Sequence, residues 1–244
     1  MRLDQYLVNQ NFFKSRTQAQ EAIKKGSVSV LENSVWKTQR RPSYVCTEGV
    51  QIKCDTTDFL WVSRAGLKLE GALKSLNLNL ENKTALDIGQ STGGFTDVLL
   101  SKGVKQVIGL DVGKNQLHAK IRAHEKVKFY ENTDARDLSF IKDEHINFFT
   151  VDLSFISLLK VAPEIYNILN NKEASGLFLV KPQFEVGRSL VGKGGLVKSA
   201  EIQLQCEKDV VRGLEDIGFN VLDYFPSILK GKDGNQEFFC FVST

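Results

Sequence analysis

The sequence is poor in the residues that build metal sites and disulfide frameworks. Its 244 residues include four cysteines and three histidines, and no two cysteines form a C-x-x-C pair. The histidines show no spacing that would complete a zinc site with the cysteines. We therefore expect no bound metal, and the scattered thiols favour a cytoplasmic protein with reduced cysteines.

Long hydrophobic runs are also absent. No apolar stretch approaches the roughly 18 residues that span a bilayer. Residues 1–10 lack the apolar core of a secretory signal. The sequence therefore predicts no stable membrane insertion.

The chain has little net charge, but its small excess is unevenly placed. The formal net charge is +3. Residues 1–58 hold nine Lys and Arg against six Asp and Glu, whereas the rest of the chain holds 23 of each sign. A cationic excess confined to the first quarter favours a small module that binds a polyanion.

The N-terminal part is predicted to be a small α+β domain over residues 1–56. Residues 3–7 and 15–25 have the apolar spacing of two helices, and the second begins with a capping pattern. Residues 27–30 and 50–53 alternate between apolar and polar side chains, as half-buried strands do. These elements indicate a compact unit of two helices and a few strands.

This domain resembles the RNA-binding fold of bacterial ribosomal small-subunit protein four. The matching residues are Arg2-Leu3-Asp4 with Leu7, and Ser15-Arg16 with Ala19, Ile23, Gly26, Val28 and Val30. The resemblance implies that RNA is bound by the start of the second helix and by the turn after it. The cations at these places are Arg2, Arg16, Lys24 and Lys25. Alternatively, the two lysines are solvated cations at a helix C-terminus, where positive charge is favourable in any case.

Residues 57–62 are expected to connect this domain to a second domain at residues 63–244. There, strand-like runs alternate with helical segments such as 95–101 and 200–215. The candidate strands are residues 83–87, 106–110, 146–151, 177–180, 221–225 and 237–242. This alternation predicts an α/β domain with a doubly wound, mostly parallel sheet.

A glycine-rich loop, Asp87-Ile88-Gly89-Gln90-Ser91-Thr92-Gly93-Gly94-Phe95, leads from a predicted strand into a helix. A phosphate-binding P-loop would need Lys at position 95, and a dinucleotide fingerprint would need Gly at position 91. The loop instead suits a nucleoside cofactor without a pyrophosphate, such as S-adenosylmethionine (SAM). Its candidate cofactor-binding residues are Asp87, Gly89, Ser91, Gly93, Gly94 and Phe95.

Two acidic residues further along the chain are candidates for the rest of the cofactor site. Asp111 ends the strand after the loop, where an acid can accept hydrogen bonds from ribose hydroxyls. Asp134, in Thr133-Asp134-Ala135-Arg136-Asp137, is placed to receive an adenine amino group. Either residue could instead be an ordinary turn acid at a strand end.

Ionisable residues also stand at the ends of predicted elements in the second domain. Asp152 and Lys181 each follow an apolar strand directly, and Lys68 and Glu237 stand at the ends of two further segments. Ligands in open α/β sheets bind at the carboxyl ends of strands. These four residues are therefore candidates for a catalytic site, although many strand-end charges have no such role.

Nearly the whole chain resembles the TlyA (hemolysin-A-like) family of ribosomal RNA 2′-O-methyltransferases, whose catalytic half is similar to the FtsJ methyltransferases. The matching stretches are residues 63–69, 87–97, 152–156, 180–185 and 234–238. The resemblance implies a Rossmann-like class I methyltransferase fold, SAM as cofactor, and ribosomal RNA or a ribosomal subunit as partner, with cytidine as the modified nucleotide. It also implies a catalytic Lys-Asp-Lys-Glu tetrad, which falls on Lys68, Asp152, Lys181 and Glu237.

One residue of the cofactor loop departs from the family pattern. Gln90 stands where the family usually carries Ala. A larger side chain at this position is expected to crowd or rearrange the loop.

The tetrad agrees with the chemistry of methyl transfer to a ribose hydroxyl. The acceptor oxygen must lose a proton, and the reactants must be aligned for an in-line displacement. Lys181 is the residue that we place at the hydroxyl, either as a neutral general base or as an ammonium that stabilises the developing oxyanion. Asp152 would orient Lys181 and face the sulfonium of the cofactor. Lys68 and Glu237 would complete a set of paired charges.

The segment 187–198 contains four glycines together with Arg188 and Lys193. This composition favours a mobile basic loop that closes over bound RNA. The alternative is a flexible surface loop without a role in binding.

Three other functions remain open at this point. A membrane-damaging hemolysin would need an apolar span or a strongly amphipathic helix, and neither is evident. A non-catalytic RNA-binding assembly factor would not need an intact tetrad, and SAM binding would distinguish it. A base-carbon methyltransferase commonly uses a Cys nucleophile, and no cysteine lies in a candidate motif.

Overall fold

The structure, a computed structural model, describes residues 1–13, 15–47, 49–55, 60–169 and 173–244. The chain divides into two compact units, residues 1–61 and 62–244. Each unit has a hydrophobic core of its own. Of the connection that we expect at 57–62, residues 57–59 lie outside the described residues.

The N-terminal unit combines two helices with a three-stranded antiparallel sheet in the order β2-β1-β3. Its elements are α1 (Leu3–Asn9), α2 (Arg16–Lys25), β1 (Val28–Glu32), β2 (Val35–Thr38) and β3 (Ile52–Cys54). Strand β2 has no counterpart in the sequence-based prediction. All four of its residues are exposed, so its sequence carries no alternation of apolar and polar side chains.

Helix α2 begins and ends where the sequence predicts. The Ser15 hydroxyl accepts a hydrogen bond from the Gln18 amide at 3.3 Å, which satisfies one of the free donors of the first turn. Gly26 ends the helix with φ of +87°, a left-handed conformation that glycine adopts at little cost. Ala19 and Ile23 of this helix are fully buried and form part of the core of the unit.

The C-terminal unit is built on a seven-stranded sheet in the order β6-β5-β4-β7-β8-β10-β9. Strands β4 to β8 are parallel, whereas β10 is antiparallel to both β8 and β9. The strands are β4 (Thr84–Ile88), β5 (Gln106–Leu110), β6 (Val127–Tyr130), β7 (Phe148–Val151), β8 (Ser175–Val180), β9 (Asn220–Pro226) and β10 (Phe238–Ser243). The predicted α/β fold with a mostly parallel sheet is confirmed.

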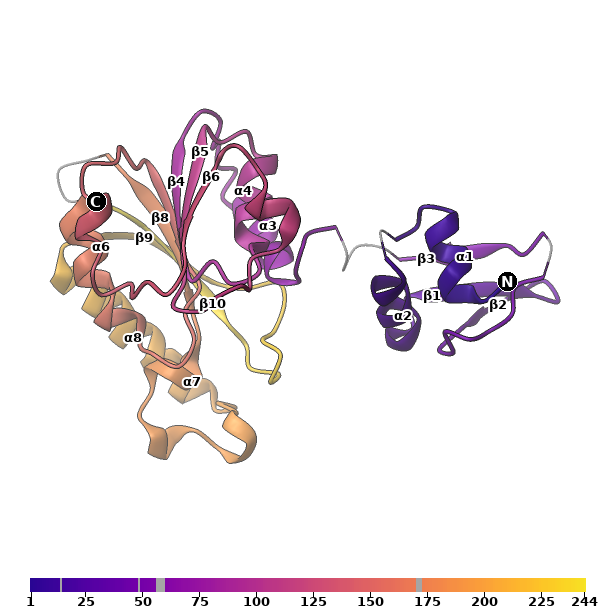
Figure 1. Cartoon of the computed structure of the whole chain (residues 1–244). Coiled ribbons are helices and arrows are strands. Elements are labelled where there is room, and N and C mark those ends of the chain that lie inside the picture. The colour runs from indigo at the N-terminus through magenta and orange to yellow at the C-terminus, as the bar shows by residue number, and fades with distance from the viewer. Residues whose placement is uncertain (14, 48, 56–59, 170–172) are drawn as a thin grey trace. The chain divides into compact units, whose positions relative to one another are not determined.

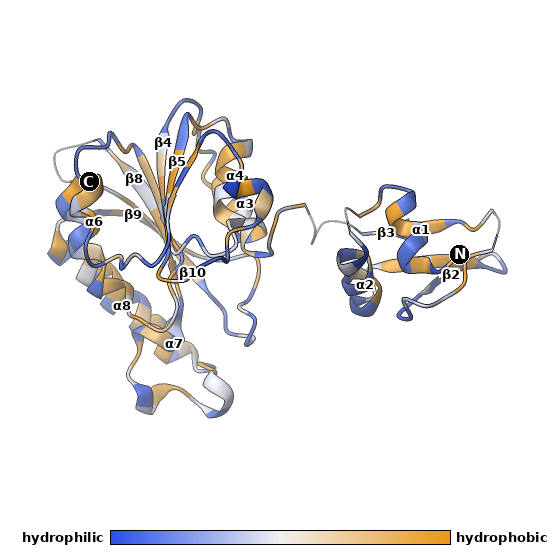
Figure 2. Ribbon diagram, viewed as in Figure 1, coloured by the Kyte–Doolittle hydropathy of each residue, from blue (hydrophilic) through white to orange (hydrophobic). Residues whose placement is uncertain are grey.

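Helices cover both faces of this sheet (Figure 1). Helix α3 (Ala65–Ser75) packs with α4 (Gly94–Ser101) on one face, and α6 (Ala162–Leu169) and α8 (Ala200–Ile217) lie on the other. All residues of β4 are buried, and Figure 2 shows β4 and β5 coloured mostly as hydrophobic. A parallel strand that helices cover on both faces is expected to have this composition.

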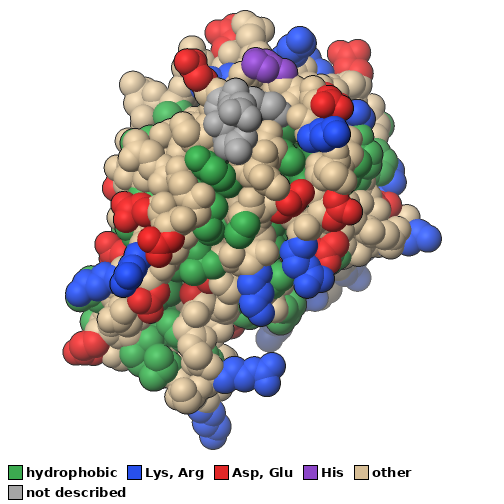
Figure 3. All heavy atoms as spheres, turned by 90° about the vertical axis from the view of Figure 1, so that its left-hand side faces the viewer, with side chains coloured by type: hydrophobic (Ala, Val, Ile, Leu, Met, Phe, Trp, Pro, Cys, Tyr) green, Lys and Arg blue, Asp and Glu red, His purple; other side chains and the backbone are tan. Residues whose placement is uncertain are grey.

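The face of the C-terminal unit that carries α6 and α8 bears charges of both signs. Figure 3 shows acidic and basic side chains interspersed over this face, with small groups of hydrophobic side chains between them. Among the helices of the described residues, none is both long and apolar enough to cross a membrane.

Candidate active site

The sheet topology brings three of the tetrad positions to one edge. Asp152 directly follows β7 and Lys181 directly follows β8, and these parallel strands are neighbours in the sheet. Glu237 directly precedes β10, which is antiparallel to β8, so the start of β10 lies at the end of β8, with Phe238 paired to Val180. The carboxyl edge of the sheet is the expected place for a ligand in this class of fold.

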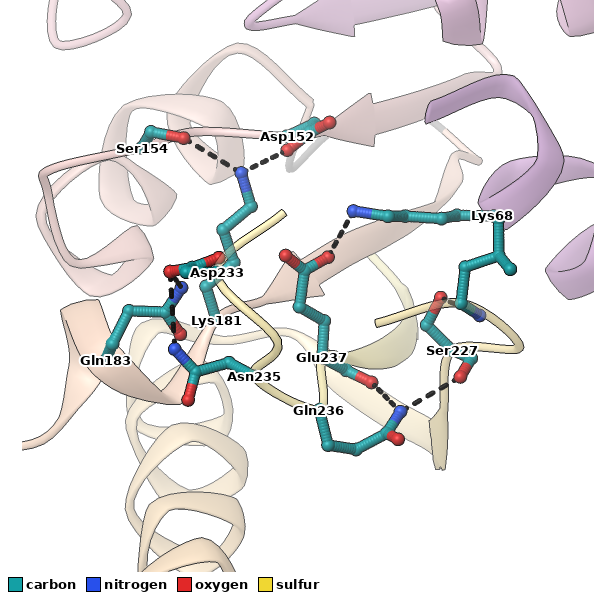
Figure 4. A network of polar contacts seen from close by, with 11 residues as sticks. Lys68, Asp152, Ser154, Lys181, Gln183, Ser227, Asp233, Asn235, Gln236 and Glu237 are labelled. Atoms are coloured by element: carbon teal, nitrogen blue, oxygen red, sulfur yellow. Dashed lines mark hydrogen bonds and ion pairs between the residues drawn. The ribbon is translucent and has the colours of Figure 1, made fainter. Parts of the chain in front are cut away.

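The tetrad forms two lysine–carboxylate pairs (Figure 4). The Lys68 ammonium, from the first turn of α3, donates to Glu237 Oε2 at 2.5 Å. Lys181 Nζ lies 2.6 Å from Asp152 Oδ1 and donates a hydrogen bond to the Ser154 hydroxyl at 2.9 Å. Asp152 Oδ1 has no hydrogen-bond partner among the described residues, so its contact with Lys181 is an ion pair without the alignment of a hydrogen bond.

These charges are largely removed from water. The exposed fractions of the side chains are 13% for Lys68, 4% for Glu237, 11% for Lys181 and 17% for Asp152. Pairing each ammonium with a carboxylate offsets part of the desolvation cost of burying four charges. Burial raises the pKa of Glu237 above its ordinary value, although the neighbouring Lys68 and Lys181 ammonium groups act in the opposite direction.

A cavity of about 510 Å³ adjoins the tetrad. Its wall includes all four tetrad residues and most of the glycine-rich loop that follows β4. The start of α3, the segments after β7 and β8, and the loop between β9 and β10 supply the rest of the wall. The cavity therefore joins the predicted cofactor loop to the predicted catalytic residues.

Two glycines of the cofactor loop allow the other segments to approach it closely. A Cβ atom on Gly89, which has φ of +81°, would lie 2.3 Å from the carbonyl oxygen of Asp152. A Cβ atom on Gly94 would lie 2.1 Å from Ser63 Oγ. A side chain at either position would separate the loop from a segment that carries a tetrad residue, Asp152 in one case and Lys68 in the other.

The structure places Asp87 beneath the cofactor loop and away from the cavity wall. Its side chain is fully buried, and it accepts hydrogen bonds from the hydroxyls of Thr96 at 2.6 Å and Thr150 at 2.9 Å. Burial raises the pKa of Asp87 to about 6, and the nearby Asp152 acts in the same direction. Asp87 therefore joins β7 and α4 under the loop, a different position from the cofactor contact that the sequence predicts.

The Gln90 side chain turns inward and does not fill the loop. It is 6% exposed, and its amide donates to the Thr96 hydroxyl at 2.8 Å. It packs against Gly109 of β5, where a Cβ atom would lie 2.0 Å from Gln90 Nε2. The absence of a side chain at position 109 thus makes room for the larger residue at position 90.

The other predicted cofactor residues occupy different parts of the loop. Ser91 and Phe95 line the cavity, whereas Gly93 is buried against Leu117 and Ile121. Gly93 has φ of +89° and directly precedes α4. Its place in the structure is therefore at the start of the helix, behind the cavity wall.

Asp111 and Asp134 lie outside the wall of this cavity. The Asp111 carboxylate accepts hydrogen bonds from the Ser91 amide at 2.8 Å and the Gly113 amide at 2.6 Å, so it holds the loop from below. Asp134 lines a second hollow of about 350 Å³ with Tyr130 and other residues. Arg136 pairs with Asp134 at 2.5 Å and, by hydrogen bonding, lowers the pKa of Asp134 to about 2.

The two N-terminal arginines converge on one carboxylate. Asp4 is fully buried, and it accepts hydrogen bonds from Arg2 at 3.1 Å and from Arg16 at 2.9 Å. The exposed fractions of the arginine side chains are 46% and 50%. Both guanidinium groups are therefore fixed on their inner side and open to solvent on the other.

Lys24 and Lys25 are exposed at the end of α2, and Lys25 pairs with Glu21 at 2.7 Å. Arg40, which sequence reasoning did not select, lies beside them and donates to the Lys24 carbonyl at 3.0 Å. The adjacent basic pair Arg40-Arg41 is the sequence signal that could have indicated this residue.

Arg188 and Lys193 lie on two short 3₁₀ helices, η4 (Arg188–Leu190) and η5 (Lys193–Gly195), and both are exposed. Neither belongs to the cavity wall. The end of their segment is held by Asn235, which accepts from the Val197 amide at 2.8 Å and donates to the Gly195 carbonyl at 2.8 Å.

Sequence reasoning also missed several residues of the cavity wall. Phe155 is 91% exposed with φ of +68°, an uncommon conformation for a bulky residue, and its ring centroid lies 5.3 Å from that of Phe184. Lys230 and Lys232 reach the wall from the loop between β9 and β10. Phe155 belongs to a matched motif, whereas no sequence pattern marks the two lysines.

The cysteines lie away from this site. All four are in described parts of the chain, and none belongs to the cavity wall. Burial raises the pKa of Cys206 and of Cys240 to about 12, and that of Cys54 to about 11. Such thiols are poor nucleophiles near neutral pH.

Both units of the chain are similar to known protein families. Residues 61–243 match the family described as FtsJ-like methyltransferase, and residues 1–30 match the S4 domain. The chain is 39% identical over 240 residues to Hemolysin A of Brachyspira hyodysenteriae, with 98% of each chain covered. It is 34% identical over 244 residues to the 16S/23S rRNA (cytidine-2′-O)-methyltransferase TlyA of Mycobacterium tuberculosis, with 100% of this chain and 90% of TlyA covered.

A similar solved structure is that of a protein from Streptococcus thermophilus that is described as a hemolysin. The TM-score is 0.76 and the sequence identity is 35%, with 100% of this chain and 88% of the other covered. The family match spans almost the entire unit that contains the cavity and the tetrad. The chain therefore belongs to the FtsJ-like methyltransferases, in the group that contains TlyA and hemolysin A, and it carries an S4 domain at its N-terminus.

Proposed function

We propose that this protein transfers the methyl group of SAM to the ribose 2′-hydroxyl of a cytidine in ribosomal RNA. The observation that carries the proposal is the placement of two lysine–carboxylate pairs in the wall of a cavity that also contains the glycine-rich loop. A TlyA relative is named as a 16S/23S rRNA (cytidine-2′-O)-methyltransferase. A ribosomal subunit in the cytoplasm is accordingly the partner that we propose.

The loop between β4 and α4 fits SAM. Gly89 lines the cavity at the end of β4, and its lack of a side chain lets the loop backbone approach the Asp152 carbonyl closely. Asp111 uses one lone pair on each oxygen for the loop amides, and an ionised carboxylate has further lone pairs for the cofactor ribose hydroxyls. When bound, SAM supplies an electrophilic methyl group on a positively charged sulfur. The Asp152 carboxylate in the cavity wall suits a cation on this side.

Lys181 is the residue that we place at the acceptor oxygen. Its Nζ is fixed by Asp152 and Ser154 and faces the cavity, so a ribose hydroxyl can be held in hydrogen-bond reach. As a neutral amine, Lys181 would take the proton that the hydroxyl loses; as an ammonium, it would stabilise the negative charge that develops on the oxygen. Both roles require the same position of Nζ.

The Lys68–Glu237 pair has a supporting role in this proposal. Glu237 is 3% exposed, and burial raises the pKa of its carboxyl group. An unpaired negative charge at this position would therefore have a high desolvation cost. The Lys68 ammonium stabilises the ionised form and adds a second cation to the wall near the acceptor site. Asp87, Thr96 and Thr150 are positioning residues for the loop.

RNA recognition is assigned to both units. In the N-terminal S4 domain, Arg2, Arg16 and the two lysines at the end of α2 provide cations for phosphate groups. In the catalytic unit, the exposed Phe155 ring at the cavity mouth suits stacking of an unpaired base. Arg188 and Lys193 add further exposed cations to the same unit.

The test is a ribosomal RNA fragment with a single 2′-deoxy substitution at the methylated cytidine, whose base is left unchanged. Transfer of radiolabel from SAM to that nucleotide should disappear, while RNA affinity falls only modestly, because one hydroxyl is a small part of the interface. Labelling that persists on the deoxynucleotide would place the methyl group on the base and overturn the proposal.

A second measurement separates an enzyme from a non-catalytic assembly factor. Isothermal titration should detect SAM binding to the isolated protein, and unmodified ribosomal subunits should accept one methyl group per target site. A chain that binds RNA but does not bind SAM would support the assembly factor.

A further inference from the structure

The cavity wall contains five cations, and these fall into two groups. Lys68 and Lys181 are largely buried, and each is paired with a carboxylate. The other three are Arg64, Lys230 and Lys232, which are exposed. Within the described residues, none of these three lies within ion-pair distance of a carboxylate.

The two buried lysines of the wall are therefore neutralised by carboxylates. The exposed residues of the wall, which we call the rim, carry more positive than negative charge. The acidic residues of the wall are Asp152, Glu237 and Asp233, and the first two belong to the inner pairs. The Asp233 carboxylate accepts hydrogen bonds from Gln183 at 3.1 Å and Asn235 at 3.3 Å. Three cations against this single carboxylate leave the rim positively charged.

The loop that carries the two lysines is shaped by Gly231, which lies between them. Gly231 is buried, and a Cβ atom on it would lie 2.5 Å from Glu237 Oε1. Its amide donates to the Asn235 carbonyl at 2.9 Å, and its carbonyl accepts from the Gly234 amide at 3.0 Å. At Gly231 the loop thus packs closely against a tetrad residue, with Lys230 and Lys232 on either side of this contact.

The ends of this loop are fixed as well. The Ser227 amide donates to the Glu237 carbonyl at 2.8 Å, and the Gln236 side chain donates to the Ser227 carbonyl at 2.9 Å (Figure 4). The two lysine backbones therefore occupy defined positions relative to Glu237. Only their flexible side chains remain free to adapt to a ligand.

We propose that Arg64, Lys230 and Lys232 form a phosphate-binding rim, which holds the phosphodiester groups on either side of the target ribose. This inference rests on the proposed function. In an RNA strand each ribose is flanked by two phosphates, so a 2′-hydroxyl at Lys181 brings two anions to the mouth of the cavity. Exposed cations without a carboxylate partner are suited to receive them.

The rim also explains how the enzyme can separate substrate binding from chemistry. The inner lysines are neutralised by Asp152 and Glu237, so they add little attraction for a polyanion. The rim supplies that attraction without placing an unpaired charge next to the reacting atoms. Loss of rim cations should therefore raise the KM for RNA and leave the chemical step largely intact.

The experiment compares the full-length wild type with Lys230→Ala/Lys232→Ala and with Lys208→Ala. Lys208 is an exposed lysine on α8 and does not belong to the cavity wall. The dissociation constant for a ribosomal RNA fragment is measured over a range of salt concentrations. Methylation kinetics and SAM titrations are measured on the same preparations.

Each phosphate contact in a single strand contributes about 0.7 to the slope of log affinity against log salt, so the double variant should lose about 1.4 from this slope. Between 50 and 200 mM salt, the wild-type affinity should then fall about sevenfold more than that of the double variant. The KM for RNA should rise, the SAM dissociation constant should stay unchanged, and Lys230→Arg/Lys232→Arg should keep most of the wild-type affinity.

A double alanine variant with the same salt slope and the same KM as wild type and Lys208→Ala would overturn the rim. A loss of SAM affinity without a loss of RNA affinity would also overturn it, because the lysines would then serve the cofactor carboxylate. Methylation of the fragment by the wild type tests the proposed function itself. If the wild type methylates the fragment, any failure of the variants to differ concerns the rim alone.

Discussion

The guanidinium group of Arg16 lies 2.9 Å from a carboxylate oxygen of Asp4, whose side chain is completely enclosed. Arg2 approaches the same carboxylate at 3.1 Å, and Gln20 donates to it at 2.7 Å. Burial alone would raise the pKa of Asp4, but the hydrogen bonds from Gln20, Arg2 and Arg16 outweigh burial and hold it below its ordinary value. Asp4 is therefore an ionised anchor for two half-exposed arginines.

The Asp4 anchor predicts that removal of a negative charge weakens RNA binding, which is the opposite of what charge alone would do. Asp4→Asn removes one negative charge from the surface that we propose to bind RNA, and charge alone would make RNA binding tighter. We expect weaker binding instead, by about tenfold, because the two guanidinium groups lose the partner that fixes them for phosphate contacts. The dissociation constant for a ribosomal RNA fragment is compared between wild type and variant, with circular dichroism to verify folding.

Glu32→Gln is the matched control. Glu32 is a partly buried carboxylate of the same unit, and it binds Tyr44 and Lys37 but neither arginine. Its removal should leave RNA affinity unchanged or slightly improved. Tighter binding by Asp4→Asn than by wild type would contradict the anchoring role.

Removal of the Lys181 amine should lower turnover strongly and spare the binding of SAM and RNA. Lys181→Ala is expected to lower kcat by about 100-fold or more, the usual contribution of a positioned proton-transfer or charge-stabilising group. SAM and RNA affinities should stay within about threefold of wild type, because the lost interaction is made mainly in the transition state. Single-turnover methylation and equilibrium binding give the two readouts, and a wild-type methylation rate would remove Lys181 from the mechanism.

Asp111 is expected to act on the cofactor. Asp111→Ala removes the acceptor for the Ser91 and Gly113 amides and the acceptor that we propose for the cofactor ribose, so SAM should bind about 10- to 100-fold more weakly. Asp111→Asn keeps one acceptor oxygen and should lose less. Isothermal titration with SAM provides the measurement, and RNA affinity should not change. Equal SAM affinity in all three proteins would exclude Asp111 from the cofactor site.

The sequence predicts the framework of the catalytic unit because the framework depends on local patterns. Alternating strands and helices define the parallel sheet, and directly after its strands stand Asp152 and Lys181, which topology alone then brings together. The position of Glu237 follows from the same reasoning, once β10 is known to be antiparallel to β8.

The sequence does not predict which side of the loop a side chain occupies. Asp87 is enclosed because hydroxyls from α4 and β7 reach it, and this depends on packing between segments more than 60 residues apart, as Thr150 illustrates. The sequence also does not predict which exposed cations belong to the cavity wall. Lys230 and Lys232 belong to the wall, and Gly231 between them packs closely against Glu237, a contact that no local sequence pattern indicates.

The buried carboxylate of Asp87 makes folding stability depend on pH. Its folded pKa of about 6 lies above the ordinary value of 3.8, so between these values the folded state binds more protons than the unfolded state. Its contribution to the free energy of unfolding should therefore fall as pH rises from about 4 to about 6 and then level off. A difference of about two pH units corresponds to about 3 kcal/mol.

Asp87→Asn isolates this contribution, because the amide does not titrate. Urea unfolding of both proteins is measured between about pH 4 and pH 7, and the other ionisable groups cancel in the difference. The stability of the wild type relative to the variant should decline across this range. A difference that is flat or increases with pH would contradict a raised pKa at Asp87.

Gln90 and Gly109 should behave as a coupled pair. Gly109→Ala places a methyl group about where Gln90 Nε2 now lies, since a Cβ atom there would be 2.0 Å away. The Gln90 side chain must then leave its buried site and give up its hydrogen bond to Thr96. We expect a loss of about 1 to 3 kcal/mol in the free energy of unfolding, as for overpacked cores, together with weaker SAM binding.

Gln90→Ala should rescue this change, because a small residue at position 90 leaves room for the new methyl group at position 109. By itself, Gln90→Ala should cost about 1 kcal/mol, the worth of the lost hydrogen bond. In a double-mutant cycle, the double variant should lose less free energy of unfolding than the two single variants lose in total, by at least about 1 kcal/mol. Strictly additive losses would mean that Gly109 does not accommodate Gln90. If the double variant also binds SAM more tightly than Gly109→Ala alone, the packing of Gln90 against Gly109 contributes to both stability and the shape of the cofactor loop.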